Sequence, residues 1–256
     1  MSGLAYTGER MVPGAADAAT YWEHAERYRF ATRFAFGKDV ADIACGEGYG
    51  AAALAEAGAA SLVAIDNADA AVSHARETYG IDARLGNAEA IPLKDASVDL
   101  IVSFETIEHL VHPDQFLDEC QRTLRHSGRL VISTPNVDIY RQTSPDNPYH
   151  VSEMRSDEFH RRLLSRFRKV QSFGQCRPSP RWTRLRGGTR LFHLGTRLFN
   201  PLRTVQTQAI SQKSTLEYCL ARTTAPGRYF TPESVQRVTG AELARCKYLI
   251  AVASQH

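Results

Sequence analysis

Short apolar runs alternate with longer amphipathic segments over most of this chain. Strand-like runs of period two or continuous apolar character lie at residues 40–44, 62–65, 83–85, 98–104 and 130–133. Between them, a 3.6-residue period predicts helices over residues 49–57, 69–79 and 113–124, with Gly128 expected just beyond the last of these. Strands that alternate with helices predict βαβ units and an α/β fold with a doubly wound, mostly parallel sheet.

The flanking segments extend this pattern. A helix is expected over residues 17–36, with Tyr21, Ala25, Tyr28 and Phe36 on one stripe. A second is expected from an N-cap at Ser156, with a buried stripe formed by Phe159, Leu163 and Phe167. Further expected elements are strands at 170–174 and 248–253, a short helix begun by Thr231, Pro232 and Glu233, and a helical turn after Gly240.

The arrangement predicts a seven-stranded sheet domain, residues 37–176 and 229–256, preceded by an N-terminal lid over residues 1–36. Residues 177–228 are rich in arginine and punctuated by proline and glycine. We interpret them as an inserted basic cap before the last strand that binds the acceptor, with an amphipathic helix as one form it could take.

Composition narrows the class of protein. The 256 residues are 43% hydrophobic and 23% charged, which is typical of a globular chain with a sizeable core. The first residues lack a basic start followed by an apolar run, and no run reaches membrane-spanning length, so we expect a cytoplasmic protein. The five cysteines form no C-x-x-C pair and are expected to be reduced; they are Cys45, Cys120, Cys176, Cys219 and Cys246.

Charge is unevenly distributed along the chain. Residues 1–150 hold 12 Lys and Arg against 22 Asp and Glu, a net charge of −10, whereas residues 151–256 hold 19 against 6, a net charge of +13. A basic second part is consistent with an anionic substrate, an acidic lipid surface or nucleic acid, although solvated helix faces also carry arginine.

A polar group of residues follows the apolar run 98–104. If the chain becomes helical after Phe104, then Glu105, Glu108 and His109 share one face at i, i+3 and i+4. Two carboxylates and an imidazole at the carboxyl end of a strand are suited to a divalent cation. A solvated first helical turn is the alternative interpretation.

A glycine-rich loop follows the first strand. Gly46, Gly48 and Gly50 stand between a strand and a helix, and Asp66 ends the second strand 20 residues after Gly46, as in a nucleoside site. Asp42 and Glu47 place negative charge where a dinucleotide would place its pyrophosphate. A cationic ligand such as S-adenosylmethionine therefore fits better than NAD.

On these motifs, together with residues 63–66, 86–92 and 99–104, the chain resembles the class I S-adenosylmethionine-dependent methyltransferases over about residues 37–136. The resemblance implies a methionine subsite around the glycine loop, Asp66 on the ribose, an adenine edge, and Phe104 closing the pocket. The implied cofactor set is Asp42, Ala44, Gly46, Gly48, Asp66, Asn67, Asn87, Ala88, Glu89 and Phe104. A Rossmann-like sheet that binds another nucleotide is the alternative.

The E-x-x-E-H spacing resembles metal-dependent O-methyltransferases that cap small-RNA ends and those of ubiquinone biosynthesis. In the RNA enzymes, a further ligand histidine follows an S-T-P-N loop in an H-x-x-E segment. Here residues 133–136 read S-T-P-N, and His150 begins such a segment. The resemblance implies that Glu105, Glu108, His109 and His150 form a catalytic set that holds Mg²⁺ or Mn²⁺, with His150 as general base if it is not a ligand. His112, before Pro113, is assigned to a helix start.

The whole-chain pattern looks most like bacterial sugar O-methyltransferases of polysaccharide biosynthesis. It implies methylation of a sugar hydroxyl of a glycan or glycoside, such as a mannoside, in a small or oligosaccharide acceptor. A phosphorylated or lipid-linked acceptor, peripheral membrane contact and oligomerisation stay open, and nucleic acid is not the expected partner. Alternatives are RNA 3′-end 2′-O-methylation, natural-product O-methylation and S-adenosylmethionine binding without catalysis.

Overall fold

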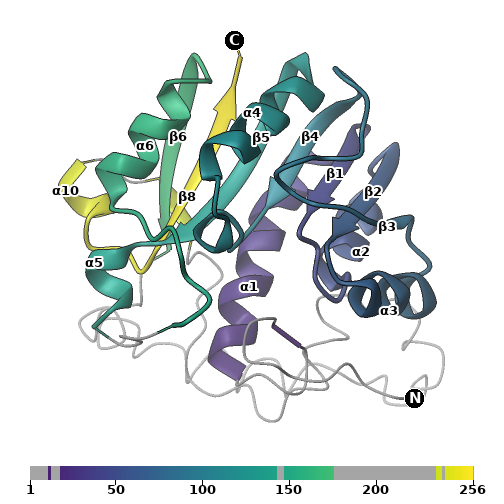
Figure 1. Ribbon diagram of the computed structural model, residues 1–256, viewed down its shortest axis with the longest axis horizontal. Coiled ribbons are helices and arrows are strands. Elements are labelled where there is room, and N and C mark those ends of the chain that lie inside the picture. Colours follow the sequence, from purple (N-terminus) through teal and green to yellow (C-terminus); the bar gives the residue numbers. More distant parts are fainter. Residues whose placement is uncertain (1–10, 13–17, 143–146, 176–234, 238–239, 256) are drawn as a thin grey trace, which may run out of the picture.

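The computed structural model describes residues 11–12, 18–142, 147–175, 235–237 and 240–255 (Figure 1). The expected basic cap, residues 177–228, lies outside the described residues. So do the first residues of the expected lid and the expected helix start at Thr231. Where the chain is described again, residues 235–237 form a strand.

The described strands form one mixed sheet in the order β3-β2-β1-β4-β5-β8-β6-β7. Neighbouring strands from β3 to β5 are parallel, β8 is antiparallel to β5 and β6, and β7 is antiparallel to β6. Their bounds are β1 Asp39–Ile43, β2 Ser61–Asp66, β3 Ala83–Leu85, β4 Val98–Ser103, β5 Leu124–Pro135, β6 Lys169–Gln175, β7 Val235–Arg237 and β8 Tyr248–Ser254. This confirms the predicted doubly wound sheet, to which β7 adds a short edge strand.

Helices cover both faces of the sheet (Figure 1). One face packs against α4 (Pro113–Thr123) and α6 (Ser156–Leu164). The other packs against α1 (Ala18–Ala31), α2 (Tyr49–Glu56) and α3 (Asp69–Tyr79). The short elements are η1 (Thr32–Phe34), η2 (Ile107–His109), α5 (Val137–Tyr140) and α10 (Gly240–Leu243).

The core follows from the alternation of side chains along each strand. In β4, Ile101 packs with Phe116 of α4, whereas Leu100 and Val102 pack on the opposite face with Tyr28 of α1. Strands β1 and β4 are neighbours in the sheet. The chain leads from β1 to β2 on one side and from β4 to β5 on the other, so the strand order reverses between β1 and β4. A crevice at their carboxyl ends is the usual ligand site in such sheets.

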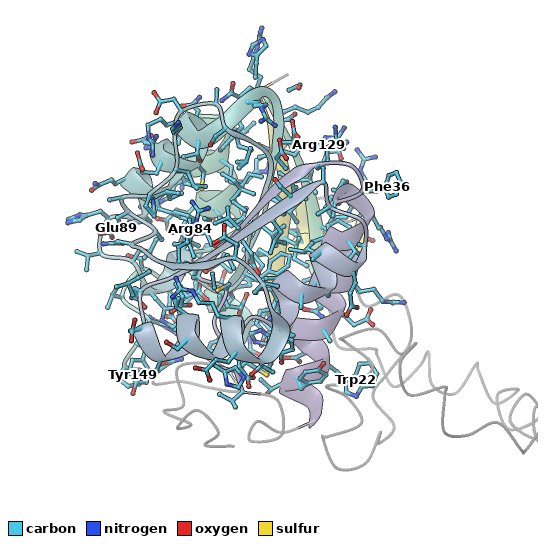
Figure 2. The ribbon with its side chains drawn as sticks, turned by 90° about the vertical axis from the view of Figure 1, so that its right-hand side faces the viewer. Trp22, Phe36, Arg84, Glu89, Arg129 and Tyr149 are labelled. Carbon is cyan, nitrogen blue, oxygen red and sulfur yellow. The ribbon has the colours of Figure 1, made fainter. Side chains whose placement is uncertain are left out.

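Three local predictions are wrong. Phe36 is not on the buried stripe of the first helix, because α1 ends at Ala31, and its side chain projects outward with 82% exposure (Figure 2). The N-cap of α6 is Arg155 rather than Ser156, without a side-chain cap. Gly128 lies within β5, where a Cβ atom would stand 2.8 Å from the carbonyl oxygen of Arg125, so it serves a close backbone approach instead of ending α4.

Cysteine chemistry also differs in part from expectation. Cys45 and Cys120 are free and buried, as predicted. Cys246 is disulfide-bonded, so the prediction of reduced cysteines is wrong for this residue. Within the described part of the chain, no helix has the length and apolar character needed to cross a membrane.

Candidate functional site

The glycine loop connects β1 to α2 through several residues in left-handed backbone conformations. Ala44, Gly46 and Gly48 have φ angles of 58°, 57° and 93°. At Gly48 a Cβ atom would stand only 2.6 Å from the Cβ of Ala75 in α3, so both the backbone angle and the packing require glycine. The loop therefore packs closely against α3 at Gly48.

Asp66 fixes this loop from the end of β2. Its Oδ2 accepts a hydrogen bond from the amide of Gly46 at 2.8 Å, and its Oδ1 accepts one from the amide of Ala68 at 3.0 Å. The carboxylate thus bridges the ends of two neighbouring parallel strands, where a ribose carboxylate is expected in nucleoside sites.

A cavity of about 210 Å³ opens at this end of the sheet. Seven of the ten predicted cofactor residues line it, namely Ala44, Gly46, Asp66, Asn67, Asn87, Ala88 and Phe104. Cys45 and Glu47 also line the cavity, as neighbours of Gly46 in the loop expected at the methionine subsite. The lining residues that were not predicted are Met11, His24, Tyr28, Tyr49, Ile65, Gly86, Thr106 and Leu110. The sequence analysis assigned Tyr28 only to the buried stripe of the first helix. The sequence of that helix does not indicate that the Tyr28 ring contacts the glycine loop at Gly50.

Three predicted cofactor residues do not line the cavity. Gly48 faces α3. Glu89 accepts a hydrogen bond from the amide of His112 at 2.7 Å, so it satisfies the start of α4. Asp42 is fully buried behind the loop and accepts the hydroxyl of Tyr28 at 3.2 Å.

Burial controls the charge of Asp42. Desolvation raises the pKa of its carboxyl to about 8, against the opposing hydrogen bond from Tyr28 and with a smaller contribution from the charge of Asp66. The same burial raises the pKa of Tyr28 well above its usual value. A cationic ligand in the neighbouring cavity favours the ionised carboxylate, so the local charge suits a sulfonium or ammonium group.

The chain does not become helical after Phe104, so the predicted three-residue face does not form. Glu105 has a φ of 52°, and only Ile107–His109 are in a 3-10 helix. Glu105 instead turns to β5, where its Oε1 accepts a hydrogen bond from Ser133 at 2.7 Å, and it lines the cofactor cavity. The four-ligand prediction is therefore corrected: Glu105 is not among the residues whose ligand atoms all lie within 4.8 Å of one another.

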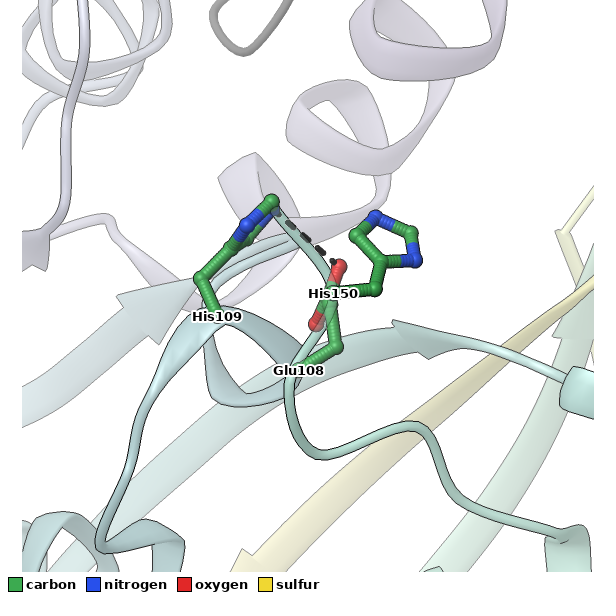
Figure 3. A group of neighbouring side chains, drawn as sticks. All are labelled: Glu108, His109 and His150. Carbon is green, nitrogen blue, oxygen red and sulfur yellow. Dashed lines mark ion pairs between the residues drawn. The ribbon is translucent and has the colours of Figure 1, made fainter. Parts of the chain in front are cut away.

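Glu108, His109 and His150 do come together (Figure 3). Each offers one ligand atom, and these atoms all lie within 4.8 Å of one another. The loop that carries His150 is tied to η2, because the amides of Val151 and Ser152 both donate to the carbonyl of Glu108 at 2.9 Å. Positions 43 and 44 residues apart in the sequence are thus joined by backbone hydrogen bonds.

The side chain of Glu108 is fully buried and only partly satisfied. Its Oε2 accepts the hydroxyl of Thr134 at 3.1 Å, whereas Oε1 accepts no hydrogen bond and lies 4.0 Å from Nε2 of His109. Burial and the charge of Glu105 raise the pKa of Glu108 well above its usual range. A cation beside Oε1 would give this oxygen a partner and would favour the ionised form of Glu108. The donor set therefore fits a divalent metal ion.

In both imidazoles Nδ1 has an acceptor outside the cluster. Nδ1 of His109 lies 3.0 Å from the carbonyl oxygen of Tyr149, and Nδ1 of His150 lies 3.1 Å from Oε1 of Glu153. With Nδ1 donating in each ring, Nε2 keeps the lone pair that a metal ion or an acceptor proton requires.

Residues 41–132 match the family model described as "Methyltransferase domain". The chain is 41% identical over 162 residues to a Mycolicibacterium smegmatis protein named "Probable S-adenosylmethionine-dependent methyltransferase", covering 61% of this chain and 62% of that one. It is 37% identical over 100 residues to the ubiquinone biosynthesis O-methyltransferase of Parvibaculum lavamentivorans, covering 37% and 39%. The chain thus spans about three fifths, or less, of the length of these relatives.

The fold is shared with solved structures. A S-adenosylmethionine-dependent methyltransferase from Thermotoga maritima superimposes with a TM-score of 0.59 at 13% identity, over 93% of this chain and 94% of that one. The chain is therefore similar over residues 41–132 to the methyltransferase-domain family, and it shares its fold with a solved S-adenosylmethionine-dependent methyltransferase.

Proposed function

We propose that this chain is an enzyme that transfers the methyl group of S-adenosylmethionine to a sugar hydroxyl of a glycan or glycoside, with the help of Mg²⁺ or Mn²⁺. One observation carries the proposal: His109 both lines the cofactor cavity and belongs to the ligand cluster with Glu108 and His150. A reacting hydroxyl and the methyl donor would therefore meet at one residue.

The cofactor side uses residues that the structure brings to the cavity. Bound S-adenosylmethionine supplies an electrophilic methyl group on a sulfonium centre. Asp66 would accept hydrogen bonds from the ribose, and the backbone of Gly46 would lie next to the methionine moiety. Tyr28 and Phe104, whose ring centroids are 5.0 Å apart, line the cavity together and would exclude water from the reacting atoms.

The metal side uses Glu108, His109 and His150 as ligands. A bound divalent cation lowers the pKa of an acceptor hydroxyl and orients it. Glu105 lies beside the cluster, where it accepts from Ser133 and contributes negative charge to the cavity wall. In the metal-free alternative, Nε2 of His150 accepts the hydroxyl proton as general base while Glu153 stabilises the resulting imidazolium.

Oxygen as the accepting atom is supported by the relative named as an O-methyltransferase. The sugar assignment rests on the resemblance of the whole chain to bacterial sugar O-methyltransferases. RNA 3′ ends and small natural products carry the same hydroxyl chemistry and are the rival acceptors. A protein that binds S-adenosylmethionine without turnover is the rival from another class.

Labelled S-adenosylmethionine with a panel of mannosides, other glycosides and small RNAs tests the acceptor. We expect label on a sugar oxygen, located by mass spectrometry. Label on RNA 3′ ends assigns the activity to the RNA class, and tight cofactor binding without any transfer favours the non-catalytic class.

Exhaustive chelation followed by addition of Mg²⁺ or Mn²⁺ tests the metal. Activity should be lost and then restored, and Glu108→Gln should depress turnover while it leaves cofactor affinity near that of the wild type. The matched control is His112→Gln, a histidine outside the cluster. Full turnover after chelation would remove the metal from the proposal and leave His150 as the base.

A further inference from the structure

Glu105 lines the cavity with a carboxylate that is only partly used. Its Oε1 accepts the hydroxyl of Ser133 at 2.7 Å, and within the described part of the chain no donor reaches its Oε2. Unlike Oε1 of the fully buried Glu108, this unpartnered oxygen is accessible, because the side chain is half-buried and faces the cavity. A carboxylate oxygen in a cavity is a binding group for a hydrogen-bond donor of a ligand.

The other carboxylates that line the cavity are already engaged. Asp66 accepts two backbone amides and is expected at the ribose. Oε1 of Glu47 lies 2.9 Å from Nε2 of His74. Among the described residues that line the cavity, Glu105 is therefore the carboxylate best placed to bind the acceptor.

The backbone adopts an unfavourable conformation to place this side chain. Glu105 has a φ of 52°, in the left-handed region, which is costly for a residue with a Cβ atom. Ser133 of β5 holds it at two points, because its Oγ also accepts the amide of Glu105 at 3.2 Å. Such backbone angles persist mainly at functional sites, where the surrounding structure enforces them. The strain therefore indicates that the direction of the Glu105 carboxylate matters to function.

Contacts with β5 place the carboxylate on the acceptor side of the cavity. Strand β5 lies on the opposite side of β4 from β1 and β2, which carry the glycine loop and the expected ribose carboxylate. Ser133 of β5 holds Glu105, and the next residue, Thr134, donates to Oε2 of Glu108 at 3.1 Å. Glu105 thus leans away from the ribose site and toward the ligand cluster, whose His109 lines the same cavity.

The local charge favours a neutral donor over a cation. The fully buried Arg27 of α1 interacts electrostatically with both Glu105 and Glu108, so it already offsets part of their negative charge. An ammonium group of the acceptor would add positive charge next to this guanidinium, a divalent ion and the sulfonium of the cofactor, which Coulomb repulsion disfavours. A hydroxyl group donates to the carboxylate without adding charge.

We propose that Oε2 of Glu105 accepts a hydrogen bond from a second, unmethylated hydroxyl of the acceptor, which positions the sugar with its reacting hydroxyl at the cluster of Glu108, His109 and His150. Glu105 is thus an acceptor-binding residue and not a metal ligand. This inference rests on the proposed function and narrows its substrate class to sugars with at least two free hydroxyls.

Metal and cofactor binding are measured first, in Glu105→Gln, which keeps the size of the side chain and removes its charge. Calorimetry should give an S-adenosylmethionine affinity near that of the wild type and a loss of Mn²⁺ affinity far smaller than in Glu108→Gln. An equal loss of Mn²⁺ affinity would make Glu105 a metal ligand. A loss of cofactor affinity of about tenfold or more would assign the carboxylate to the cofactor. Either result overturns the proposal.

Acceptor binding is measured next, with S-adenosylhomocysteine present so that no transfer occurs. Methyl glycosides and their monodeoxy derivatives are titrated into wild type and Glu105→Gln. In the wild type, deletion of one hydroxyl should weaken binding by about tenfold or more, the range for a hydrogen bond to a charged group. In Glu105→Gln the same deletion should cost about threefold or less, whereas deletions elsewhere on the sugar should cost the same in both proteins. Glu77→Gln, at an exposed position of α3, is the matched control and should behave as the wild type does.

Turnover with labelled S-adenosylmethionine separates the two proposals. The hydroxyl whose deletion depends on Glu105 should differ from the methylated one, which mass spectrometry locates. If every deletion costs the same in wild type and Glu105→Gln, or if the dependent hydroxyl is the methylated one, the Glu105 assignment is overturned and sugar methylation stands. Glu105-dependent binding without methyl transfer to any sugar overturns the proposed function and leaves the binding site standing.

Discussion

Glu153 holds the ring of His150 in place: its Oε1 lies 3.1 Å from Nδ1 of the imidazole, and its Oε2 accepts a hydrogen bond from Nε of Arg141 at 2.7 Å. Both His150 and Glu153 are largely buried. A carboxylate in this position fixes the tautomer of a ligand histidine and raises its basicity. The fourth residue of the H-x-x-E segment thus has a physical role although it is not itself in the ligand cluster.

Glu153→Gln should weaken Mn²⁺ binding by about 10- to 100-fold, the usual effect of losing such a partner. An amide can present its NH₂ group to Nδ1 and so favour the wrong tautomer, and it carries no charge. Calorimetric titration with Mn²⁺ measures the change, and cofactor affinity should be unaffected. Glu158→Gln in α6, outside the cluster, is the control. Equal Mn²⁺ affinity in Glu153→Gln and wild type would show that His150 is not a ligand.

Asp66→Ala should reduce S-adenosylmethionine affinity by roughly 10- to 100-fold, the range for losing hydrogen bonds to a charged group. The loss has two sources, since Asp66 would bind the ribose and also holds the amides of Gly46 and Ala68. Calorimetry with the cofactor measures it. Asp69→Ala, at the exposed first residue of α3, should bind as the wild type does. Unchanged affinity in Asp66→Ala would contradict the ribose assignment.

Gly48→Ala and Gly80→Ala separate backbone strain from crowding. Both glycines have positive φ angles, but only at Gly48 would the new Cβ meet Ala75, whereas nothing lies within 4 Å at Gly80. We expect Gly80→Ala to lower the free energy of unfolding by about 1–2 kcal/mol, the cost of the left-handed conformation. Gly48→Ala should cost about 1–3 kcal/mol more through overpacking and should weaken cofactor binding. Urea unfolding of the two variants gives the comparison, and equal losses would argue against the loop packing described above.

The fold could be predicted because its signals are local. The helix predicted over residues 69–79 matches α3, and the apolar run 98–104 differs from β4 only at its last residue. Strand β5 is longer than predicted, since it begins at Leu124 and its length is set by pairing with β4 and β8. Partners distant in the sequence supply those hydrogen bonds, so the apolar pattern of the strand alone does not reveal its ends.

The site was predicted less completely because its geometry also depends on local backbone angles and on partners distant in the sequence. Glu108, His109 and His150 come together as expected, yet Glu105 does not, because its left-handed φ breaks the helical spacing on which the prediction depended. Arg27 gave no signal in the sequence. Its buried position follows from contacts with Gln175 and Tyr248, which lie about 150 and 220 residues further along the chain.

Asp42 makes stability depend on pH in a direction opposite to that of an ordinary paired carboxylate. Its pKa is about 8 in the folded protein against a usual value of 3.8. Between these values the folded state binds the proton and the unfolded state does not, so the free energy of unfolding falls as pH rises. The stabilisation is complete below about pH 4 and is lost as pH rises through 8.

Asp42→Asn should therefore become more stable relative to the wild type as pH increases. The slope is about 1.4 kcal/mol per pH unit within the window, because one pKa unit corresponds to that free energy. Urea unfolding without cofactor at pH 5, 6 and 7 measures the difference, in which the other titrating groups largely cancel. Tyr28→Phe is the control, since it removes only the hydrogen bond to Asp42 and should retain the decline of the wild type with pH. A difference between Asp42→Asn and wild type that is flat from pH 5 to 7 would mean that Asp42 is ionised in the folded protein, and that the buried loop tolerates its charge without a cationic ligand.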